Sequence, residues 1–262
     1  MKIKFYQGHW FGIDLKKLSR QEGLLIDVVA SEKLYHHVYK KLLKDDENPI
    51  TAEWLKNKHN LSGWLCNFIH EKKLQQGSIL SVGCGLGIVE QSLVEKGIKI
   101  DLQECQDISI QYFQKNYPDE FQKIKFIHSL DMKEIEDSSY DAIMAITSTY
   151  CLSDQVLLEF LHAVHRILRK KGIFIWYETV LNVNDIIQFL KNKLRGKKQE
   201  GVLWGWKRSK GSLISRALKN NFSYQENYYF DKNNKIIKPS TFFGLPINVD
   251  AAWQMMVFKK ND

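Results

Sequence analysis

The stretch from Gly77 to Gly97 reads GSILSVGCGLGIVEQSLVEKG and decides the fold. A short apolar run, Ile79–Val82, predicts a buried β-strand, and the apolar spacing after Ile88 predicts a helix that ends at Gly97. Between them stand glycines at alternate positions: Gly83, Gly85 and Gly87. Glycine lets the backbone turn sharply and approach a ligand closely. The pattern therefore predicts a ligand beyond the carboxyl end of the strand, where open α/β sheets bind cofactors.

Two details narrow the class of ligand. A dinucleotide fingerprint needs a small residue at the position that Ile88 occupies, and a phosphate loop needs Lys-Ser/Thr after its last glycine; neither is present. The turn also holds no basic residue, which favours a cofactor without a pyrophosphate. Glu104 ends the next predicted strand, 21 residues after Gly83, where a carboxylate can accept both hydroxyls of a ribose. These features indicate a nucleoside cofactor that carries an amino acid.

Five ordered features resemble the class I S-adenosylmethionine-dependent methyltransferases. Leu80–Gly87 is similar to the family's first motif, Glu104 to its ribose-binding acid, and Asp131 to its acid near the adenine. Ser139–Ile146 resembles its fourth strand, and His165–Gly172 resembles the basic run before its fifth. An ordered set of this kind is more specific than one glycine motif. The resemblance implies S-adenosyl-L-methionine as cofactor and S-adenosyl-L-homocysteine as product.

The resemblance also implies an α/β fold: a Rossmann-like, doubly wound, mostly parallel seven-stranded sheet with an antiparallel last strand, plus an N-terminal helical extension. We expect a helical cap over residues 1–76 and a core over 77–262, with a substrate-pocket insertion at 179–211. The apolar spacing predicts helices at 24–43, from Thr51, and at 88–96, 107–116, 153–168, 183–194 and 212–220, the last capped by Ser212. It predicts strands at 78–82, 99–104, 125–128, 140–146, 173–178, 222–230 and 253–259.

One departure from the family concerns the amino-acid end of the cofactor. The family usually has an acid at the position of Ser81, where it helps to hold the methionine amino group. Its absence leaves that group with a weaker partner and keeps a non-catalytic domain open as an alternative. The cofactor residues expected from the resemblance are Ser81, Gly83, Cys84, Gly85, Gly87, Glu104, Asp131, Met132 and Thr147.

Two residues are candidates for the chemistry. Methyl transfer needs an aligned nucleophile, and a hydroxyl nucleophile benefits from a general base. Glu178 ends the predicted fifth strand and faces the same crevice, so we expect a base or substrate ligand there, or else a helix-capping acid. Tyr150 follows the fourth predicted strand. We expect its side chain either to contact the substrate or to lie in the core. The Asn/Asp-Pro-Pro-aromatic run of nucleobase and amide methyltransferases is absent there.

The expected acceptor side consists of aromatic residues and an arginine in two segments. Trp10 lies in an N-terminal aromatic cluster that folds over the cofactor or pins the terminus to the core. Trp204, Trp206 and Arg208 lie in the insertion, and they suit an acceptor with a flat or sugar face and an anionic group. The alternative for the insertion is local packing against the sheet.

Charge and composition bear on partners. The net charge is +8, and residues 191–219 hold ten basic residues against one acid, which is either a nucleic-acid or anion-binding patch or a solvated surface. The four cysteines lack metal or disulfide spacing, so we expect reduced thiols, no metal and a cytoplasmic protein. No apolar run reaches the roughly 20 residues of a membrane span, and we expect no membrane partner.

We therefore expect an S-adenosylmethionine-dependent methyltransferase that acts on a hydroxyl or amine of a small molecule. The insertion favours a phosphorylated, nucleotide-linked or sugar-containing acceptor. Two other functions remain: an RNA or protein methyltransferase that uses the basic patch at 191–219, and a non-catalytic scaffold with the same fold. The oligomeric state and the choice between oxygen and nitrogen stay open.

Overall fold

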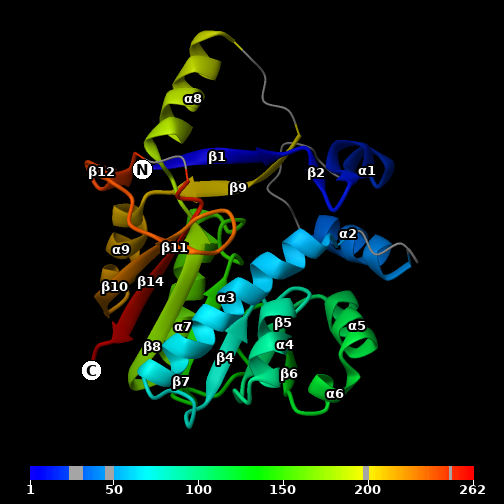
Figure 1. Ribbon diagram of the computed structural model, residues 1–262, viewed down its shortest axis with the longest axis vertical. Coiled ribbons are helices and arrows are strands. Elements are labelled where there is room, and N and C mark those ends of the chain that lie inside the picture. Colours follow the sequence, from blue (N-terminus) through cyan, green and yellow to red (C-terminus); the bar gives the residue numbers. More distant parts are fainter. Residues whose placement is uncertain (24–31, 45–49, 197–200, 248–249) are drawn as a thin grey trace.

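The protein is organised around one central sheet with helices on both faces (Figure 1). The computed structural model describes residues 1–23, 32–44, 50–196, 201–247 and 250–262. Its helices are α1 (Leu15–Gln21), α2 (Glu32–Lys44), α3 (Ala52–Glu71), α4 (Ile88–Glu95), α5 (Asp107–Asn116), α6 (Pro118–Phe121), α7 (Asp154–Ile167), α8 (Val183–Leu194) and α9 (Lys210–Lys219).

The strands follow the expected alternation in the core and add short pairs outside it. They are β1 (Lys2–Gln7), β2 (His9–Trp10), β3 (Ile13–Asp14), β4 (Ile79–Val82), β5 (Asp101–Glu104), β6 (Phe126–His128), β7 (Tyr140–Ile146), β8 (Leu168–Thr179), β9 (Val202–Arg208), β10 (Phe222–Phe230), β11 (Ile236–Ile237), β12 (Thr241–Phe242), β13 (Leu245–Pro246) and β14 (Trp253–Lys260).

The central sheet has the order β11-β10-β14-β8-β7-β4-β5-β6. Strands β4 to β8 pair in parallel, whereas β14 lies antiparallel between β8 and β10, which confirms the expected last strand. The two-residue β11 makes the sheet eight-stranded rather than seven-stranded. Because β4, β5 and β7 are parallel neighbours, their carboxyl ends meet at one edge, and the residues that follow them lie close together there.

Alternating residues of the strands build two apolar layers, one on each face of the sheet. On one face Ile79 and Met144 pack with buried residues of α3 and α4, such as Leu65 and Leu93. On the other face, residues one position away pack against α7 and α9: Leu80, Ile143, Phe174, Leu161, Val164, Leu213 and Ala217. This double coverage explains why all four residues of β4 are buried, as expected of a parallel strand with helices on both faces.

The N-terminal segment differs from the expected helical extension. Residues 1–14 form strands, and β1 pairs antiparallel with β9 from the insertion, with Lys2 opposite Arg208. Within the described residues up to position 76, the helices are α1, α2 and α3, and α3 begins after Thr51, which caps it as predicted. The predicted helix over 24–43 is confirmed from Glu32 onward by α2, and its first eight positions lie outside the described residues.

Two boundaries also differ. Helix α9 begins at Lys210 with Ser209 as its N-cap, not at Ser212, because the Ser209 hydroxyl accepts the Ser212 N–H at 3.4 Å. Strand β8 begins at Leu168 and takes in the basic run predicted to precede it. No helix in the described ranges is long and apolar enough to cross a bilayer.

Candidate cofactor and acceptor site

The glycine turn between β4 and α4 is built as the sequence predicts. Gly83, Gly85 and Gly87 have φ values of 66°, 58° and 69°, in the left-handed region that side chains rarely adopt. A Cβ on Gly83 would lie 2.7 Å from the Cβ of Ser148, in the loop after β7. The turn therefore passes close to the neighbouring strand end, and glycine is required for that approach.

Glu104 lies beneath this turn at the end of β5 and is 6% exposed. Its Oε2 accepts the Gly85 N–H at 2.7 Å, and its Oε1 accepts the N–H groups of Cys105 at 2.8 Å and Gln106 at 3.2 Å. A carboxylate offers about four acceptor positions, so Oε2 retains one beyond its bond to Gly85. Glu104 thus stabilises the glycine turn, and its Oε2 can still accept a hydrogen bond from a hydroxyl of a ligand.

A second buried acid lies where the sequence analysis expected none. The Ser81 hydroxyl donates to Glu90 Oε1 at 2.7 Å, and the two residues are 0% and 2% exposed. Burial raises the pKa of Glu90, and the hydrogen bond from Ser81 opposes that shift. Glu90 occupies the first turn of α4, where the helix dipole favours a negative charge. The sequence does carry a sign of this residue, because Glu90 is an acid among apolar residues at the start of the predicted helix.

Lys58 of α3 brings a cation to the same place. Its Nζ lies 5.1 Å from the centre of the Trp54 ring. Burial lowers the pKa of Lys58, and the carboxylate of Glu90 raises it in opposition, so the two charges are near each other. Within the described part of the chain, no hydrogen bond from the Lys58 ammonium is formed. An anion near Glu90 would find this ammonium available.

Four more of the expected cofactor residues are Cys84, Met132, Thr147 and Asp131, of which Met132 is buried in the apolar layer that faces α7. Burial, and then the carboxylates of Glu104 and Glu90, raise the pKa of the Cys84 thiol, so this residue lies near both acids. Met132 and Thr147 follow the loop after β6 and the end of β7, with φ values of 60° and 53°. Such backbone is uncommon outside glycine and clusters at functional sites. Asp131 is exposed and pairs with Lys133 at 2.5 Å.

Aromatic side chains from four segments, β2, α2, the loop after β7 and β9, meet above the glycine turn. The Tyr150 hydroxyl accepts the Trp204 Nε1–H at 2.8 Å and lies 3.1 Å from the Tyr35 hydroxyl. The ring centre of Trp10 lies 5.1 Å from that of Trp204. The Tyr39 hydroxyl would lie 3.0 Å from a Cβ on Gly85, which links this cluster to the turn. Tyr35 and Tyr39 were expected only as apolar positions of a helix.

Tyr150 is a neutral hydrogen-bonding group in this setting. Burial raises the pKa of its phenol well above the ordinary value, with Cys151 adding to the effect and the Tyr35 and Trp204 hydrogen bonds opposing it. A phenol with a raised pKa is a poor base near neutral pH, since its charged form is disfavoured. It remains able to orient an acceptor by hydrogen bonding.

Glu178 holds the loop that carries Tyr150. It is 4% exposed, and its Oε1 accepts both the N–H of Thr149, at 3.0 Å, and the Thr149 hydroxyl. The Trp176 Nε1–H also donates to that hydroxyl, at 2.8 Å. Burial raises the pKa of Glu178. This bonding favours a positioning role over that of a base, because proton transfer to Oε1 would disrupt its bonds to Thr149.

We expect Glu178→Ala to destabilise the protein and Glu178→Gln to do so less. Alanine leaves the buried N–H and hydroxyl of Thr149 without their acceptor, at a cost of about 1–3 kcal/mol per group, whereas glutamine keeps an oxygen there. Urea unfolding measures the free energy of unfolding of both variants. The control is Glu159→Ala, which changes an exposed acid and should have a free energy of unfolding within about 0.5 kcal/mol of the wild type. Equal stability of the alanine variant and the wild type would contradict this role.

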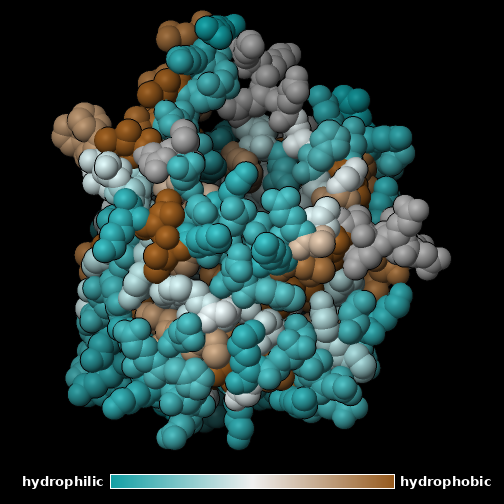
Figure 2. Space-filling model, viewed as in Figure 1, coloured by the Kyte–Doolittle hydropathy of each residue, from teal (hydrophilic) through white to brown (hydrophobic). Residues whose placement is uncertain are grey.

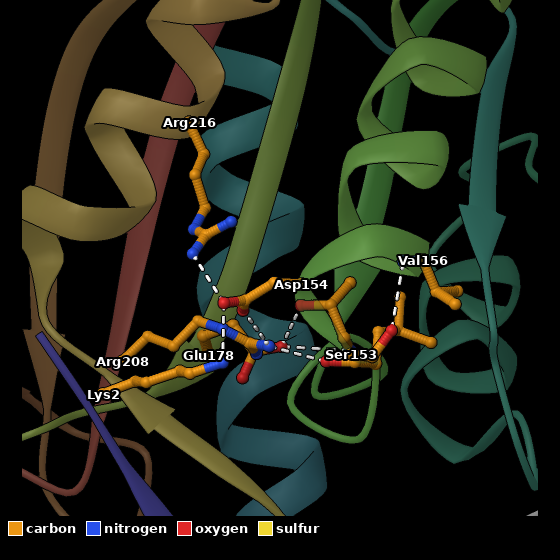
Figure 3. A network of polar contacts seen from close by, with 9 residues as sticks. Lys2, Ser153, Asp154, Val156, Glu178, Arg208 and Arg216 are labelled. Atoms are coloured by element: carbon orange, nitrogen blue, oxygen red, sulfur yellow. Dashed lines mark hydrogen bonds and ion pairs between the residues drawn. The ribbon is translucent and has the colours of Figure 1, made fainter.

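Arg208 lies in an ion-pair network beside the site (Figure 3). Arg208 is 2% exposed and donates to the carbonyl of Leu152 at 2.6 Å and to Asp154 at 3.2 Å. Lys2 and Arg216 also reach Asp154, at 2.6 and 3.1 Å. Partial burial raises the pKa of Asp154, but the bonds from Lys2 and Arg208 outweigh it and lower that pKa to about 2.

This network joins β1, β9, α7 and α9 around one carboxylate. Figure 3 shows Lys2 and Arg208 approaching Asp154 together, with Arg216 opposite them and Glu178 nearby. The Lys2 ammonium and the Arg208 guanidinium also each lie 5.3 Å from the centre of the Trp206 ring. The expected substrate ligands Trp206 and Arg208 therefore have intramolecular partners, whereas Trp10 and Trp204 line the aromatic cluster above the glycine turn.

Comparison with known proteins agrees with this geometry. Residues 79–172 match the model of a family described as a methyltransferase domain, a stretch that runs from β4 into β8. The match contains the glycine turn and Glu104 but ends before Glu178 and the insertion. A sequence search of the curated proteins finds no match.

Solved structures share the fold at low sequence identity. Magnesium protoporphyrin IX methyltransferase from Synechocystis, with bound S-adenosylhomocysteine, superposes with a TM-score of 0.60 at 9% identity, covering 95% of this chain and 100% of that one. A methyltransferase from Methanosarcina mazei gives 0.57 at 14%, covering 74% and 97%. 1,6-Didemethyltoxoflavin-N1-methyltransferase from Burkholderia thailandensis gives 0.53 at 11%, covering 87% and 84%. At these identities the likeness establishes the fold.

Proposed function

Since the chain carries a class I S-adenosylmethionine-dependent methyltransferase domain, we propose that it methylates a hydroxyl or amine of a small molecule. The observation that carries this proposal is the position of the aromatic cluster directly above the glycine turn, with the Tyr39 hydroxyl against Gly85. Cofactor and acceptor would meet there. Two structural neighbours whose names state an acceptor act on small ring compounds, which supports the small-molecule class.

The residues at the turn fit S-adenosylmethionine. Glycines at positive φ give the close backbone approach, and Glu104 has an acceptor position left for a ribose hydroxyl. The amino-acid end carries an ammonium and a carboxylate, and Glu90 and Lys58 offer the two opposite charges. We assign the ammonium to Glu90 and the carboxylate to Lys58, so that Ser81 acts by positioning Glu90 through its 2.7 Å hydrogen bond.

The chain contributes alignment and exclusion of water. When bound, the cofactor supplies a methyl group on a positively charged sulfur, which makes that carbon electrophilic. The glycine turn and Glu104 fix the nucleoside, and the rings of Trp10 and Trp204 cover the acceptor side. Tyr150 offers its neutral hydroxyl to orient the acceptor. Such positioning supplies much of the acceleration in a transfer of this kind.

The aromatic cluster supports an acceptor with a flat or sugar face. An anionic group on the acceptor remains a proposal from the composition of the insertion, because Lys2, Arg208 and Arg216 already bind the carboxylate of Asp154. A polymer acceptor is less favoured, because part of the basic patch is already paired: Lys207 with Asp185, and Arg208 and Arg216 with Asp154. None of the four cysteines, all of which lie in the described part of the chain, forms a disulfide, which supports a cytoplasmic location.

The proposal is tested by following radiolabelled methyl groups. The chain is incubated with labelled S-adenosylmethionine and, in parallel, with the small-molecule, RNA and protein fractions of a cell extract. We expect label in the small-molecule fraction, and none with Glu104→Ala, which loses the ribose contact. Label confined to RNA or protein would contradict the small-molecule acceptor.

A further inference from the structure

Helix α8 (Val183–Leu194) presents an apolar face that the described structure covers only in part, near its first turns. None of its residues is buried. Ile187, Leu190 and Leu194 are 42%, 51% and 87% exposed. Residues three and four apart share one face of a helix, and the apolar residues recur at that spacing: Val183, Ile186, Ile187, Leu190 and Leu194.

The helix stands away from the central sheet. Figure 1 shows α8 rising from the end of the molecule where β1 and β9 lie, and Figure 2 shows apolar surface along it. Its first turn is fixed by a capping box between Asn182 and Asp185 and by the 2.8 Å ion pair of Asp185 with Lys207. Beyond that turn, no helix or strand among the described residues packs along its length. The first turn of α8 is therefore fixed to the rest of the protein, and the apolar residues beyond it face solvent.

The charges of α8 are basic and border the apolar face. Lys191, Lys193 and Arg195 are exposed on its second half and just after it. The one acid of the helix, Asp185, is already paired with Lys207. The opposite face carries uncharged polar residues: Asn184, Gln188 and Asn192. A helix with this pattern is typical of surfaces that bind in the plane of a membrane interface.

A second exposed apolar feature lies toward the same side in Figure 1: the hairpin of β12 and β13. Phe242 is 57% exposed, and Phe243, at the turn, is 91% exposed. Their rings contact each other edge to face at 4.6 Å between centres. Single exposed apolar residues are common, but a helix face and an aromatic hairpin tip together mark an interaction surface.

We infer that α8 binds the surface of a bilayer with anionic lipids, with Leu190 and Leu194 among the acyl chains and Lys191, Lys193 and Arg195 at the headgroup phosphates. A bilayer of this composition offers both the apolar layer and the negative charge that the helix needs. A second copy of the chain fits less well, because its own α8 would bring the same cations. The expectation of no membrane partner rested on the lack of a membrane span, which a contact at the bilayer surface does not require.

Helix α8 follows β8, which ends with Glu178 and Thr179, and precedes β9, which carries Trp204. It therefore belongs to the same insertion as part of the aromatic cluster. The bilayer contact itself does not depend on the reaction, so it can be measured without an acceptor.

The test is sedimentation of the full chain with vesicles of phosphatidylcholine, with and without phosphatidylglycerol. We expect binding only to the vesicles with phosphatidylglycerol, weakened by salt and reduced at least about tenfold in Leu190→Gln/Leu194→Gln. The matched control is Leu218→Gln/Leu130→Gln, which changes leucines that are 51% and 74% exposed on other parts of the surface.

Circular dichroism and the affinity for S-adenosylhomocysteine, unchanged in both variants, would establish that they are folded. Failure of the wild-type chain to bind either vesicle, or equal losses in the α8 and control variants, would overturn the inference. Self-association that is lost with Leu190→Gln/Leu194→Gln, without vesicle binding, would overturn it in favour of a second copy.

Discussion

Replacing Glu104 by alanine is expected to weaken the binding of S-adenosylhomocysteine and of 5′-methylthioadenosine by about 10- to 100-fold each. The carboxylate holds the Gly85 N–H at 2.7 Å, and its remaining acceptor position is the one that we assign to a ribose hydroxyl. A hydrogen bond to a charged group contributes about 1.5–3 kcal/mol, which accounts for the expected change. Both ligands contain the ribose, and both should respond equally in calorimetric titrations.

The control for this prediction is Glu95→Ala, which changes an acid at the other end of α4. It should leave both affinities unchanged. Thermal unfolding of Glu104→Ala separates loss of the ligand contact from loss of the fold, because Glu104 also braces the turn through Cys105 and Gln106. A folded Glu104→Ala protein that binds both ligands as the wild type does would contradict the assignment.

Glu90→Gln is expected to distinguish the same two ligands. We expect its affinity for S-adenosylhomocysteine to fall about 10- to 100-fold, which is the effect of losing one hydrogen bond to a charged acceptor. Its affinity for 5′-methylthioadenosine should stay unchanged, because that ligand lacks the amino acid. Glutamine keeps the size of the side chain and an oxygen that can accept from Ser81, so the local packing is preserved.

Lys58→Met provides the complementary measurement. It keeps the apolar stem beside Trp54 and removes the cation assigned to the carboxylate of the ligand. It should therefore show the same selective loss as Glu90→Gln. Equal losses for both ligands in either variant would indicate a structural effect on the turn, and unchanged affinity for S-adenosylhomocysteine would refute the assignment of that residue.

The sequence predicts best the elements whose signal is local. The bounds of α5, α8, β7 and β10 agree with the structure, because their apolar periods and turn residues specify each element within a few neighbours. The glycine turn is confirmed for the same reason: its three positive φ values require glycine. The site residues follow from this local geometry, since parallel strands bring their carboxyl ends to one edge.

The features that sequence analysis missed depend on contacts between distant residues. Strand β1 forms only because β9, about 200 residues later, supplies its partner, and no local pattern indicates that pairing. Glu90, to which we assign the methionine ammonium, comes from the helix after the glycine turn, whereas a motif compared position by position places that acid at Ser81. Arg208 pairs with Asp154 of α7, which also binds Lys2 of β1 and Arg216 of α9, so its place in an ion-pair network was visible only in three dimensions.

The most direct test of the central claim is calorimetric titration of the wild-type chain with S-adenosylhomocysteine. The account predicts saturable binding of one ligand per chain with a dissociation constant in the micromolar range. Absence of binding by a protein shown to be folded would contradict the cofactor site at the glycine turn, and with it the assignment of methyltransferase activity.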